Sequence, residues 1–489
     1  MRKPFLENET FDPLGRTPAP VLHDYDGDVL RDAVNAPNGK PIFTLEQIIQ
    51  QLTRAGTAWT GTPGNPTPRA GIGTVTFAFF DNAAQVYSSE RNNFAPLTIA
   101  QRDAVRAAFA LYSDLIPIHF VEGTVTTADI NIGNTTEQQD YYAAYANYPG
   151  NSLAAGDMWF SSGVAANQND IGLGGAGFRT ILHEMGHALG LSHPGAYNAT
   201  AGQTLTYEAN AEYYQDSYEY TIMSYFGSSN TGAVRSGFAQ TLLADDIAAI
   251  QSLYGPNMAT RTGDTHYGFN SDADRDAFNF TLNTNPVVGI WDAGGRDTLD
   301  FSGWTQNSRI DLTPGAFSDG GGQTSNVQIA FGTTIENAIT GSGNDSITGN
   351  AVGNVLAGGS GNDTLRGGGG NDRLEGDAGA DIFVFGSVGE SHDYTTRSNG
   401  TKLIPDMLTD FVSGTDKIDL SAIDANQNTA GDDAFTFIGS AAFSNVAGQL
   451  RAEVYGGRLH ILADVNGDGH ADFHIIASGT QILVTDFIL

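Results

Sequence analysis

The sequence predicts a multidomain protein in which a mixed α/β (α+β) domain is followed by an all-β domain of the parallel β-roll or β-sandwich type. The chain has 489 residues, more than one hydrophobic core usually organises. Helical and strand-like periodicities alternate up to Gly255, after which glycine, aspartate and asparagine become frequent and helical periodicity fades. A nine-residue repeat from Thr340 to Val384 then indicates a solenoid.

The first part of the chain alternates helices with strands. Apolar residues at helical spacing predict helices over residues 45–52, 99–112 and 242–254. Alternating apolar residues predict strands over residues 74–80, 116–121 and 128–132. The polar, proline-containing residues 1–20 are expected to form a leader or propeptide-like arm. Gly255 and Pro256 close the last helix, which predicts one domain over residues 21–255 and a second over residues 256–489.

Composition excludes several classes of function. With 23 basic and 55 acidic residues the net charge is −32, which argues against nucleic acid or an anionic membrane as a partner and fits a protein that binds many cations or one that stays soluble in salt. No apolar run of about 18 residues predicts a membrane span, so no membrane insertion is expected. Cysteine is absent, which excludes disulfides, thiolate metal sites and cysteine nucleophiles. The start of the chain lacks an apolar stretch after its basic residues, so no Sec-type signal peptide is expected.

A histidine-rich segment carries the strongest functional signal. His183 and His187 are four residues apart, so a helix presents both imidazoles on one face to one metal ion. Gly190 can adopt a left-handed conformation and end the helix, which lets the chain turn back and bring His193 in as a third ligand. Three histidines and a water make the open tetrahedral site of a catalytic zinc. Glu184 then accepts a proton from the water, whose pKa zinc lowers to about 7, and delivers it to the leaving group.

A second motif lies downstream of the histidines. Met223 and Tyr225 follow His193 at the distance expected for a methionine-containing turn beneath the zinc. Met223 is expected to form an apolar floor without binding the metal, and Tyr225 to reach the metal or the developing oxyanion through its hydroxyl. Without the histidine motif, both would be read as ordinary core residues.

The repeats predict calcium binding. In each nine-residue unit, glycines make a turn, an aspartate supplies a carboxylate and an apolar residue begins a short strand. The expected carboxylate ligands are Asp345, Asp363, Asp372 and Asp381. The turn glycines expected beside them are Gly341, Gly343, Gly358, Gly359, Gly361, Gly367, Gly368, Gly370, Gly376 and Gly379. The unit at residues 349–357 carries Asn354 in place of aspartate, which puts its site in doubt. The alternative, a flexible glycine-rich linker, would not keep an apolar residue at one fixed place in each unit.

One further segment resembles an ion-binding loop. Residues 464–470 read like the start of an EF-hand, but Ile475 stands where the twelfth position needs a bidentate glutamate. A turn between two strands is therefore expected there, with calcium binding as the weaker alternative.

The motifs together resemble the serralysin family, bacterial metzincin zinc proteases with repeats-in-toxin C-terminal domains. Besides the histidine motif, the resemblance rests on residues 243–255, 261–265, 267–270 and 291–303. It implies that His183, His187 and His193 bind one catalytic zinc, that Glu184 is the base and that Tyr225 is a fifth, switching ligand. It also implies that an edge strand pairs with extended substrate, a mode that suits broad specificity. That strand is expected at Ala144, Tyr145, Ala146 and Asn147.

The resemblance adds two structural calcium sites before the repeats. The first is expected to use Arg261, Gly263, Thr265, Asp292, Gly294 and Asp297. The second is expected to use Gly295, Asp297, Thr334 and Glu336.

The resemblance also bears on location and partners. Asp486 followed by Phe487, Ile488 and Leu489 is similar to the end of secreted members, and implies type I export to the extracellular space. In low calcium the aspartates would repel, so the C-terminal domain is expected to fold only outside the cell. The expected partners are protein substrates, the type I secretion machinery and a proteinaceous inhibitor, and a monomer is expected.

Three functions are consistent with the sequence. The first is a zinc endopeptidase, which the intact Glu184 favours because a pure binding protein needs no base. The second is a calcium-dependent surface or adhesion protein that uses the catalytic domain only for binding. The third is a zinc hydrolase of non-peptide amides, which the methionine turn and the edge strand disfavour. Cleavage of casein blocked by a chelator would separate the first from the second.

Overall fold

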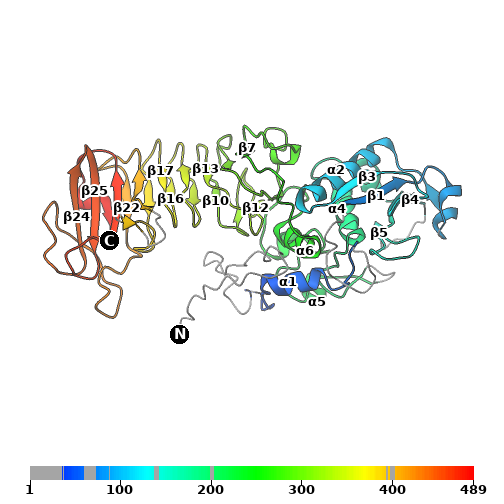
Figure 1. Cartoon of the computed structure of the whole chain (residues 1–489), viewed down its shortest axis with the longest axis horizontal. Coiled ribbons are helices and arrows are strands. Elements are labelled where there is room, and N and C mark those ends of the chain that lie inside the picture. Colours follow the sequence, from blue (N-terminus) through cyan, green and yellow to red (C-terminus); the bar gives the residue numbers. More distant parts are fainter. Residues whose placement is uncertain are drawn as a thin grey trace.

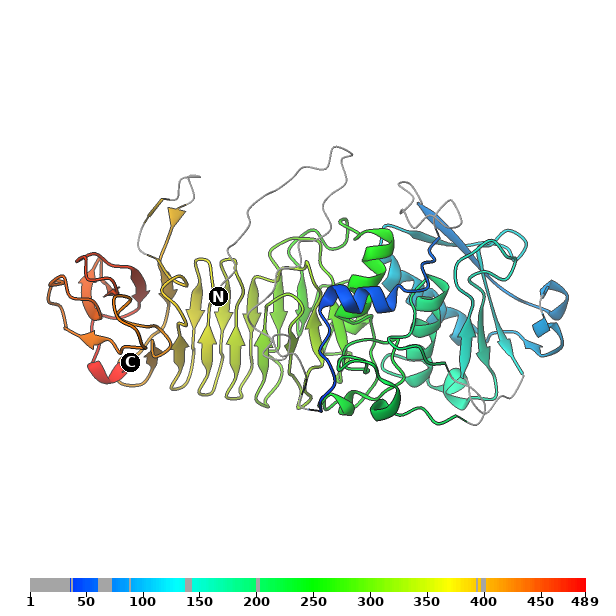
Figure 2. The ribbon, with the colours of Figure 1, turned by 90° about the horizontal axis from the view of Figure 1, so that it is seen from below.

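The molecule is elongated, with an α/β part at one end and β-structure along the rest of its length (Figures 1 and 2). The computed structural model describes residues 36, 38–59, 73–87, 89–136, 143–198, 203–392, 395–396 and 402–489. The expected leader at residues 1–20 lies outside these residues. No helix in the described ranges is long and apolar enough to cross a membrane.

The α/β part contains a six-stranded sheet in the order β3-β1-β4-β6-β5, with β2 paired to β4. Its strands are β1 (Thr74–Phe79), β2 (Phe94–Ala95), β3 (His119–Glu122), β4 (Ile130–Thr135), β5 (Ala144–Ala146) and β6 (Met158–Ser161). The strands β3, β1, β4 and β6 are parallel, whereas β5 runs antiparallel to β6 at the edge of the sheet. The three predicted strands are confirmed, with ends shifted by one to three residues.

The helices surround this sheet and complete one core. They are α1 (Leu45–Leu52), α2 (Ile99–Leu115), α3 (Ala165–Asn169), α4 (Ala176–Ala188), α5 (Tyr207–Asn210) and α6 (Ala244–Tyr254). Thr44 and Thr98 begin α1 and α2 with capping boxes that satisfy the first free N–H groups of each helix. The helices predicted at 45–52, 99–112 and 242–254 are therefore confirmed.

The middle of the molecule is a parallel β-roll. Three-residue strands recur every nine residues: β13 (Asn337–Ile339), β14 (Ser346–Thr348), β15 (Val355–Ala357), β16 (Thr364–Arg366), β17 (Arg373–Glu375) and β18 (Ile382–Val384). Odd and even strands alternate between two sheets, so each strand pairs in parallel with the strand eighteen residues away. The central residue of each strand is buried between the sheets, as Leu365 and Leu374 show. The fold class predicted from the repeat is confirmed.

Further strands extend the roll at both ends. Toward the α/β part these are β7 (His266–Gly268), β8 (Val288–Ile290), β9 (Thr298–Asp300), β10 (Arg309–Asp311), β11 (Phe317–Ser318) and β12 (Val327–Ile329). Toward the other end they are β19 (Thr395–Thr396), β20 (Lys402–Leu403), β21 (Asp406–Leu408), β22 (Lys417–Asp419), β23 (Thr436–Phe437), β24 (Gln449–Tyr455), β25 (Arg458–Asp464), β26 (Phe473–Ala477) and β27 (Phe487–Ile488). The segment at 464–472 is the turn between antiparallel β25 and β26, as expected.

The two parts of the chain share buried surface. Helix α6 ends at Gly255, which has φ +81°. Beyond this point, Val287, Trp291 and Ala330 are buried in the same hydrophobic cluster as the α/β core. Asp114 of α2 also forms 2.7 Å ion pairs with Arg261 and Arg275. The domain boundary at Gly255 stays a prediction. If the chain is cut at this residue, the C-terminal part is expected to expose apolar surface.

Candidate active site

Helix α4 and the loop after it carry the three histidines. Gly190 has φ +108°, and a Cβ at this position would lie 2.1 Å from the carbonyl oxygen of Thr57, so glycine is required at the turn. The chain then returns toward the helix, where the N–H of Leu191 donates to the carbonyl of Gly186. Arg54 holds the returning loop by donating to the carbonyls of His193 and Gly195. The predicted helix end and turn are therefore present.

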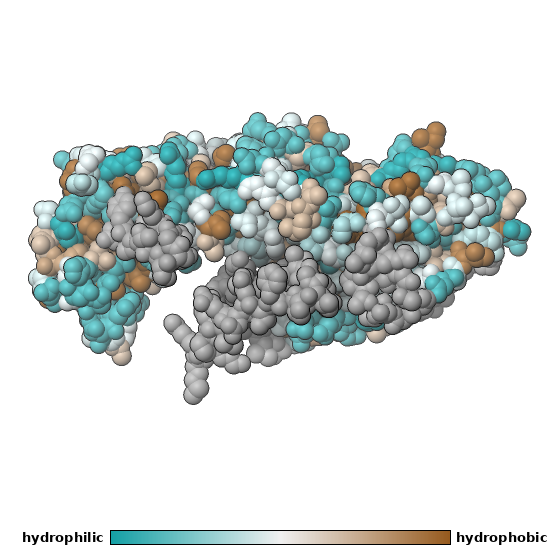
Figure 3. All heavy atoms as spheres, in the orientation of Figure 1, coloured by the Kyte–Doolittle hydropathy of each residue, from teal (hydrophilic) through white to brown (hydrophobic). Residues whose placement is uncertain are grey.

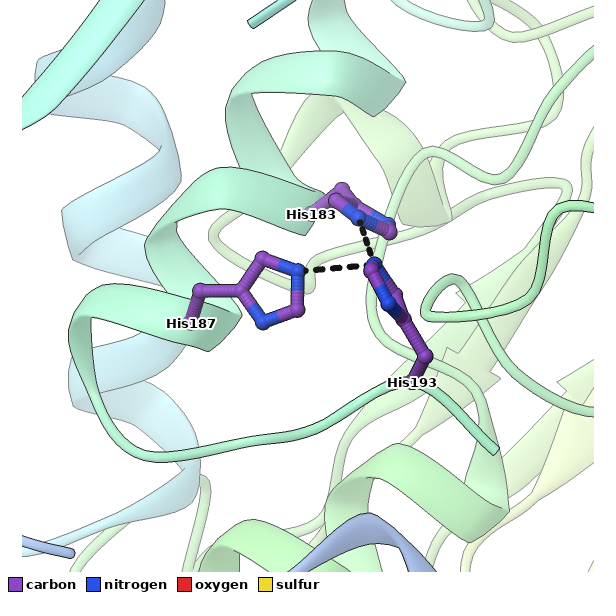
Figure 4. Close-up of side chains that lie close together, drawn as sticks. All are labelled: His183, His187 and His193. Carbon is purple, nitrogen blue, oxygen red and sulfur yellow. Dashed lines mark hydrogen bonds between the residues drawn. The ribbon is translucent and has the colours of Figure 1, made fainter. Parts of the chain in front are cut away.

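The turn brings the three imidazoles together. The Nε2 atom of His193 lies 3.0 Å from Nε2 of His187 and 3.3 Å from Nε2 of His183 (Figure 4). All three side chains are buried. Each Nδ1 faces a backbone carbonyl at 2.7–2.9 Å: Ile222 for His183, Leu191 for His187 and Tyr197 for His193.

This arrangement fits a metal ion. A carbonyl can only accept a hydrogen bond, so each Nδ1 carries the proton and each Nε2 presents a lone pair. Burial lowers the pKa of His187 to about 4 and that of His193 to about 3, so both rings are neutral at pH 7. Burial, with the charges of the other two histidines, also lowers the pKa of His183. Three converging lone pairs repel one another unless they share a cation, and three imidazoles suit zinc.

Glu184 lies beside this cluster. Its side chain is buried, and its Oε2 has no hydrogen-bond partner in the part of the chain that the structure describes. Burial raises the pKa of this carboxyl group to about 8, and the charge of Arg179 opposes the rise. A carboxylate with this basicity and a free oxygen is suited to take up a proton near neutral pH.

The methionine turn lies beneath the histidines. Met223 is fully buried, and a Cβ on Gly186 of α4 would lie 2.7 Å from its Sδ, so the helix and the turn are in close contact. The Tyr225 ring lies 4.5 Å from the ring of His193 and 5.9 Å from that of His183, measured between centroids. The structure thus brings both predicted residues to the cluster.

Two buried aspartates that the sequence did not reveal support the site. Asp246 accepts hydrogen bonds from the Thr221 hydroxyl at 2.5 Å and from the Ile222 N–H at 2.9 Å, and the carbonyl of Ile222 faces His183. Asp216 accepts from the hydroxyls of Tyr197 and Ser224, each at 2.7 Å. Because the carbonyl of Tyr197 faces His193, the two aspartates fix the orientation of two imidazoles.

The predicted substrate strand is at the edge of the sheet. Ala144, Tyr145 and Ala146 form β5, which pairs through one side with β6, and the N–H of Asn147 donates to the carbonyl of Asp157. Strand β5 packs beside α4, and the ring of Tyr148 contacts that of His187 at 5.6 Å. The assignment of these four residues to substrate binding stays a prediction.

The predicted calcium ligands of the repeats form two columns. In one, the N–H of Asp345 donates to Asp363 Oδ1 at 2.7 Å, and the N–H of Asp363 donates to Asp381 Oδ1 at 2.9 Å. In the other, the N–H of Asn354 donates to Asp372 Oδ1 at 2.8 Å. The second carboxylate oxygens of Asp345, Asp363 and Asp372 are buried and have no hydrogen-bond partner in the described ranges.

The turn glycines line the same columns. Close approach between successive coils requires glycine at Gly359 and Gly361, where a Cβ would lie 2.3 Å and 1.8 Å from the carbonyls of Gly341 and Gly343. A Cβ added at Gly358, Gly367 or Gly376 would lie against the carboxylate of Asp363, Asp372 or Asp381, respectively. Gly368, Gly370 and Gly379 approach the backbone of the preceding coils in the same way.

Two aspartates outside the repeats continue the columns. The N–H of Asp372 donates to Asp406 Oδ1 at 2.8 Å, and the N–H of Asp381 donates to Asp416 Oδ1 at 3.0 Å. Asp406 is the first residue of β21 and Asp416 directly precedes β22, and each is followed by any residue and then an apolar residue, as in the repeats. That pattern could have revealed them, but an insertion breaks the nine-residue spacing.

Asn354 stands where the other repeat units have an aspartate, and its side chain makes hydrogen bonds within the roll. Its side-chain N–H donates to the carbonyl of Glu336 at 3.0 Å and to Asn350 Oδ1 at 3.2 Å. Asn354 thus places N–H donors where the other units place a carboxylate, which supports the expectation that this unit binds calcium poorly.

The residues of the two sites expected before the repeats also converge in part. The N–H of Thr265 donates to Asp297 Oδ1 at 2.8 Å, and the N–H of Asp297 donates to Glu336 at 2.8 Å. Gly295 lies against the carbonyl of Gly263, and Gly294 donates to Asp292 at 2.7 Å. Among the described residues, no hydrogen bond joins Thr334 to the group, and Arg261 faces Asp114 through its side chain. These assignments stay predictions.

Comparison with known proteins agrees with this geometry. The family described as "Peptidase M10 serralysin C terminal" matches residues 256–489, and the family described as "Matrixin" matches residues 84–226. The chain is 41% identical to Metalloprotease AprA of Pseudomonas entomophila (strain L48), covering 96% of this chain and 93% of that protein. It is 40% identical to Serralysin of Photorhabdus sp. (strain Az29), covering 85% of each, and 38% identical to Serralysin G of Dickeya chrysanthemi, covering 92% of each. The chain therefore belongs to the serralysin family of zinc metalloendopeptidases.

Proposed function

We propose that this metalloendopeptidase is secreted, has broad specificity and uses Glu184 as its general base, and that its C-terminal part folds on calcium. The observation that carries the catalytic proposal is the convergence of three Nε2 lone pairs beside the unpartnered oxygen of Glu184. Membership of a protease family speaks against the two alternatives, an adhesion protein and a hydrolase of non-peptide amides.

The position of each residue in the site indicates its role in the reaction. His183, His187 and His193 would hold zinc, with Tyr225 as the switching fifth ligand. When bound, zinc lowers the pKa of a coordinated water to about 7 and polarises the scissile carbonyl. Glu184 accepts the proton of the attacking water and then delivers it to the leaving amine. The Tyr225 hydroxyl donates a hydrogen bond to the oxyanion, and the edge strand β5 aligns the peptide through main-chain hydrogen bonds.

A cleavage profile tests the proposed specificity. A library of peptides with added calcium and zinc is expected to be cut at internal bonds in many sequences, because main-chain pairing to β5 reads no side chain. Trimming confined to the ends of the peptides, or cleavage of a single sequence, would contradict a broad endopeptidase.

The Tyr225→Phe variant is expected to retain zinc and bind substrate about as well as the wild type, with a reduced kcat. Removing one oxyanion donor costs roughly 3 kcal/mol, which corresponds to about a hundredfold in kcat. Steady-state kinetics on a peptide substrate measure this, with the exposed Tyr455→Phe as a control. An unchanged kcat, or a loss seen only in KM, would remove Tyr225 from the mechanism.

The calcium proposal rests on the columns of aspartates. Five buried carboxylate oxygens, one each from Asp297, Asp345, Asp363, Asp372 and Asp406, have no hydrogen-bond partner among the described residues. Buried, unpaired carboxylates oppose folding unless a cation neutralises them, and calcium prefers such oxygen ligands. Since millimolar calcium is found outside cells, we propose that the folded protein acts there. We propose type I export as the route, in which the export machinery recognises residues 486–489 before Phe487 and Ile488 pair with β22 as β27.

Without calcium, stability is expected to fall as pH rises. Burial raises the pKa of Asp363 to about 7 and that of Asp381 to about 6, and it also raises the pKa of Asp372 and Asp406. An unfolded aspartate has a pKa of about 3.9, so the folded state binds more protons above pH 4 and loses stability as they dissociate. Calcium-free protein should therefore melt at a higher temperature at pH 5 than at pH 8. Circular dichroism on dialysed protein measures this, and a rise in stability toward pH 8 would contradict it.

A further inference from the structure

A cavity of about 500 Å³ opens next to the first zinc ligand. It is lined by Arg179 of α4, by Ile222 of the methionine turn and by a loop that includes Gly227, Ser236 and Phe238. Arg179 precedes His183 by four residues, so the two side chains occupy one face of α4 about 6 Å apart along the helix axis. The carbonyl of Ile222 holds Nδ1 of His183, so the other wall also adjoins the metal cluster.

Arg179 is unusual within α4. From Gly177 to Ala188 it is the one residue of the helix that is not buried. Its guanidinium lies over the rings of Tyr218 at 4.6 Å and Phe238 at 5.3 Å, both of which line the cavity. Its Nε is buried without a hydrogen-bond partner, and no acceptor for the guanidinium is found among the described residues.

The charge of this cavity is opposite to that of the chain. The protein has a net charge of −32, but the residues that line the cavity include two arginines and no acidic residue. The second arginine, Arg235, donates from its two terminal nitrogens to the carbonyls of Tyr218, Glu219 and Ser325, and only its Nε lacks a hydrogen-bond partner among the described residues. Arg179 therefore remains as the positive group that is free to bind an anion.

The face shown in Figure 3 is mostly hydrophilic, with apolar side chains scattered over it. A guanidinium that lies close to two aromatic rings and lacks an acceptor pairs best with a carboxylate, to which it can donate two parallel hydrogen bonds.

We propose that this cavity is a substrate subsite for an acidic side chain, aspartate or glutamate, at a position next to the scissile bond, and that Arg179 binds its carboxylate. The inference rests on the proposed endopeptidase function and adds a preference to the broad main-chain recognition by β5. Arg179 is then a specificity-determining residue, and the walls of Tyr218 and Phe238 contact the methylene groups of the bound side chain.

The test compares two peptides that differ only by Glu or Gln at the position next to the cleaved bond. A library profile of the wild type identifies on which side of the bond acidic residues are enriched, and the pair is built there. The wild type is expected to cleave the Glu peptide with a kcat/KM at least about tenfold higher, the lower range of a hydrogen bond to a charged group. In Arg179→Gln this ratio should fall to about 1, and Arg179→Glu should instead favour a Lys peptide. Arg458→Gln, at an exposed arginine of β25, changes the net charge equally and should keep the wild-type ratio.

Three results would overturn the inference. One is a wild-type ratio near 1 with no acidic enrichment in the library profile, a measurement that requires no variant to fold. Another is an equal loss of kcat on both peptides in Arg179→Gln with an altered pH profile and an unchanged ratio, which would mean that Arg179 acts only through the charge it exerts on Glu184. Cleavage of neither peptide by zinc-loaded wild type would contradict the endopeptidase function itself, and the inference with it.

Discussion

The Glu184→Ala variant is expected to fold and bind zinc while its turnover falls by about a hundredfold or more. Positioned acid–base catalysis contributes 10²- to 10⁴-fold, and the nearby Asp216 and Asp246 are already engaged in hydrogen bonds behind the histidines. Because Glu184 is buried with one oxygen unpartnered, its removal takes away a destabilising group and should not lower the melting temperature.

Steady-state cleavage of a peptide, zinc content and thermal melting measure this prediction together. Glu184→Gln is the matched variant, because an amide of the same size cannot accept the proton. If either variant kept more than about a tenth of the wild-type rate with one zinc per chain, the role assigned to Glu184 would be wrong.

Calcium withdrawal is expected to unfold the β-roll. Its coils bury little apolar surface beyond one residue per strand, while ordering glycine-rich turns costs large backbone entropy. Without a cation, the unpartnered oxygens of Asp363 and Asp372 remain charged and buried at pH 8. Adding calcium should restore β-structure cooperatively, whereas magnesium should not, because its small octahedral shell suits these sites poorly.

This calcium titration uses the full-length chain with the Glu184→Ala substitution. Val287, Trp291 and Ala330 are buried in the α/β core, so residues 256–489 alone would lack a native contact surface. This also means that calcium withdrawal should destabilise the α/β part more than it would a domain that folds by itself.

The measurement is circular dichroism of the protein in chelator, followed by addition of calcium or of magnesium. Asp363→Asn should raise the calcium concentration that is needed, whereas Asp432→Asn, in an exposed loop, should not. Full β-structure in chelator would contradict the calcium proposal.

The sequence predicted the parts of the fold in which residues of one kind recur at a regular spacing. The histidine row of α4 follows from a spacing of four, and the alternation of strands between two sheets follows from a spacing of nine. A regular spacing along the sequence could not reveal contacts between segments that are distant in the chain. Asp246 reaches His183 through the methionine turn, and Asp216 reaches His193 through Tyr197, so both connections depend on tertiary packing.

Other features depended on single residues in three-dimensional context. Asp406 and Asp416 extend the two columns of aspartates, but an insertion separates them from the regular repeats. Arg179 looks like an ordinary surface residue of an amphipathic helix, and only the rings that pack against it and the absence of an acceptor mark it out. The burial of Val287, Trp291 and Ala330 in the α/β core is likewise a property of packing, which the change in composition after Gly255 does not reveal.

The most direct test of the central claim is zinc removal and return at constant, saturating calcium. Cleavage of casein should stop when a zinc-selective chelator such as 1,10-phenanthroline strips the protein, and about one equivalent of zinc should restore it while circular dichroism stays unchanged. The His187→Ala variant should not recover, because one of the three converging Nε2 atoms is gone. Cleavage that continues after zinc has been removed, or full activity of His187→Ala, would contradict the assignment of a catalytic zinc to His183, His187 and His193.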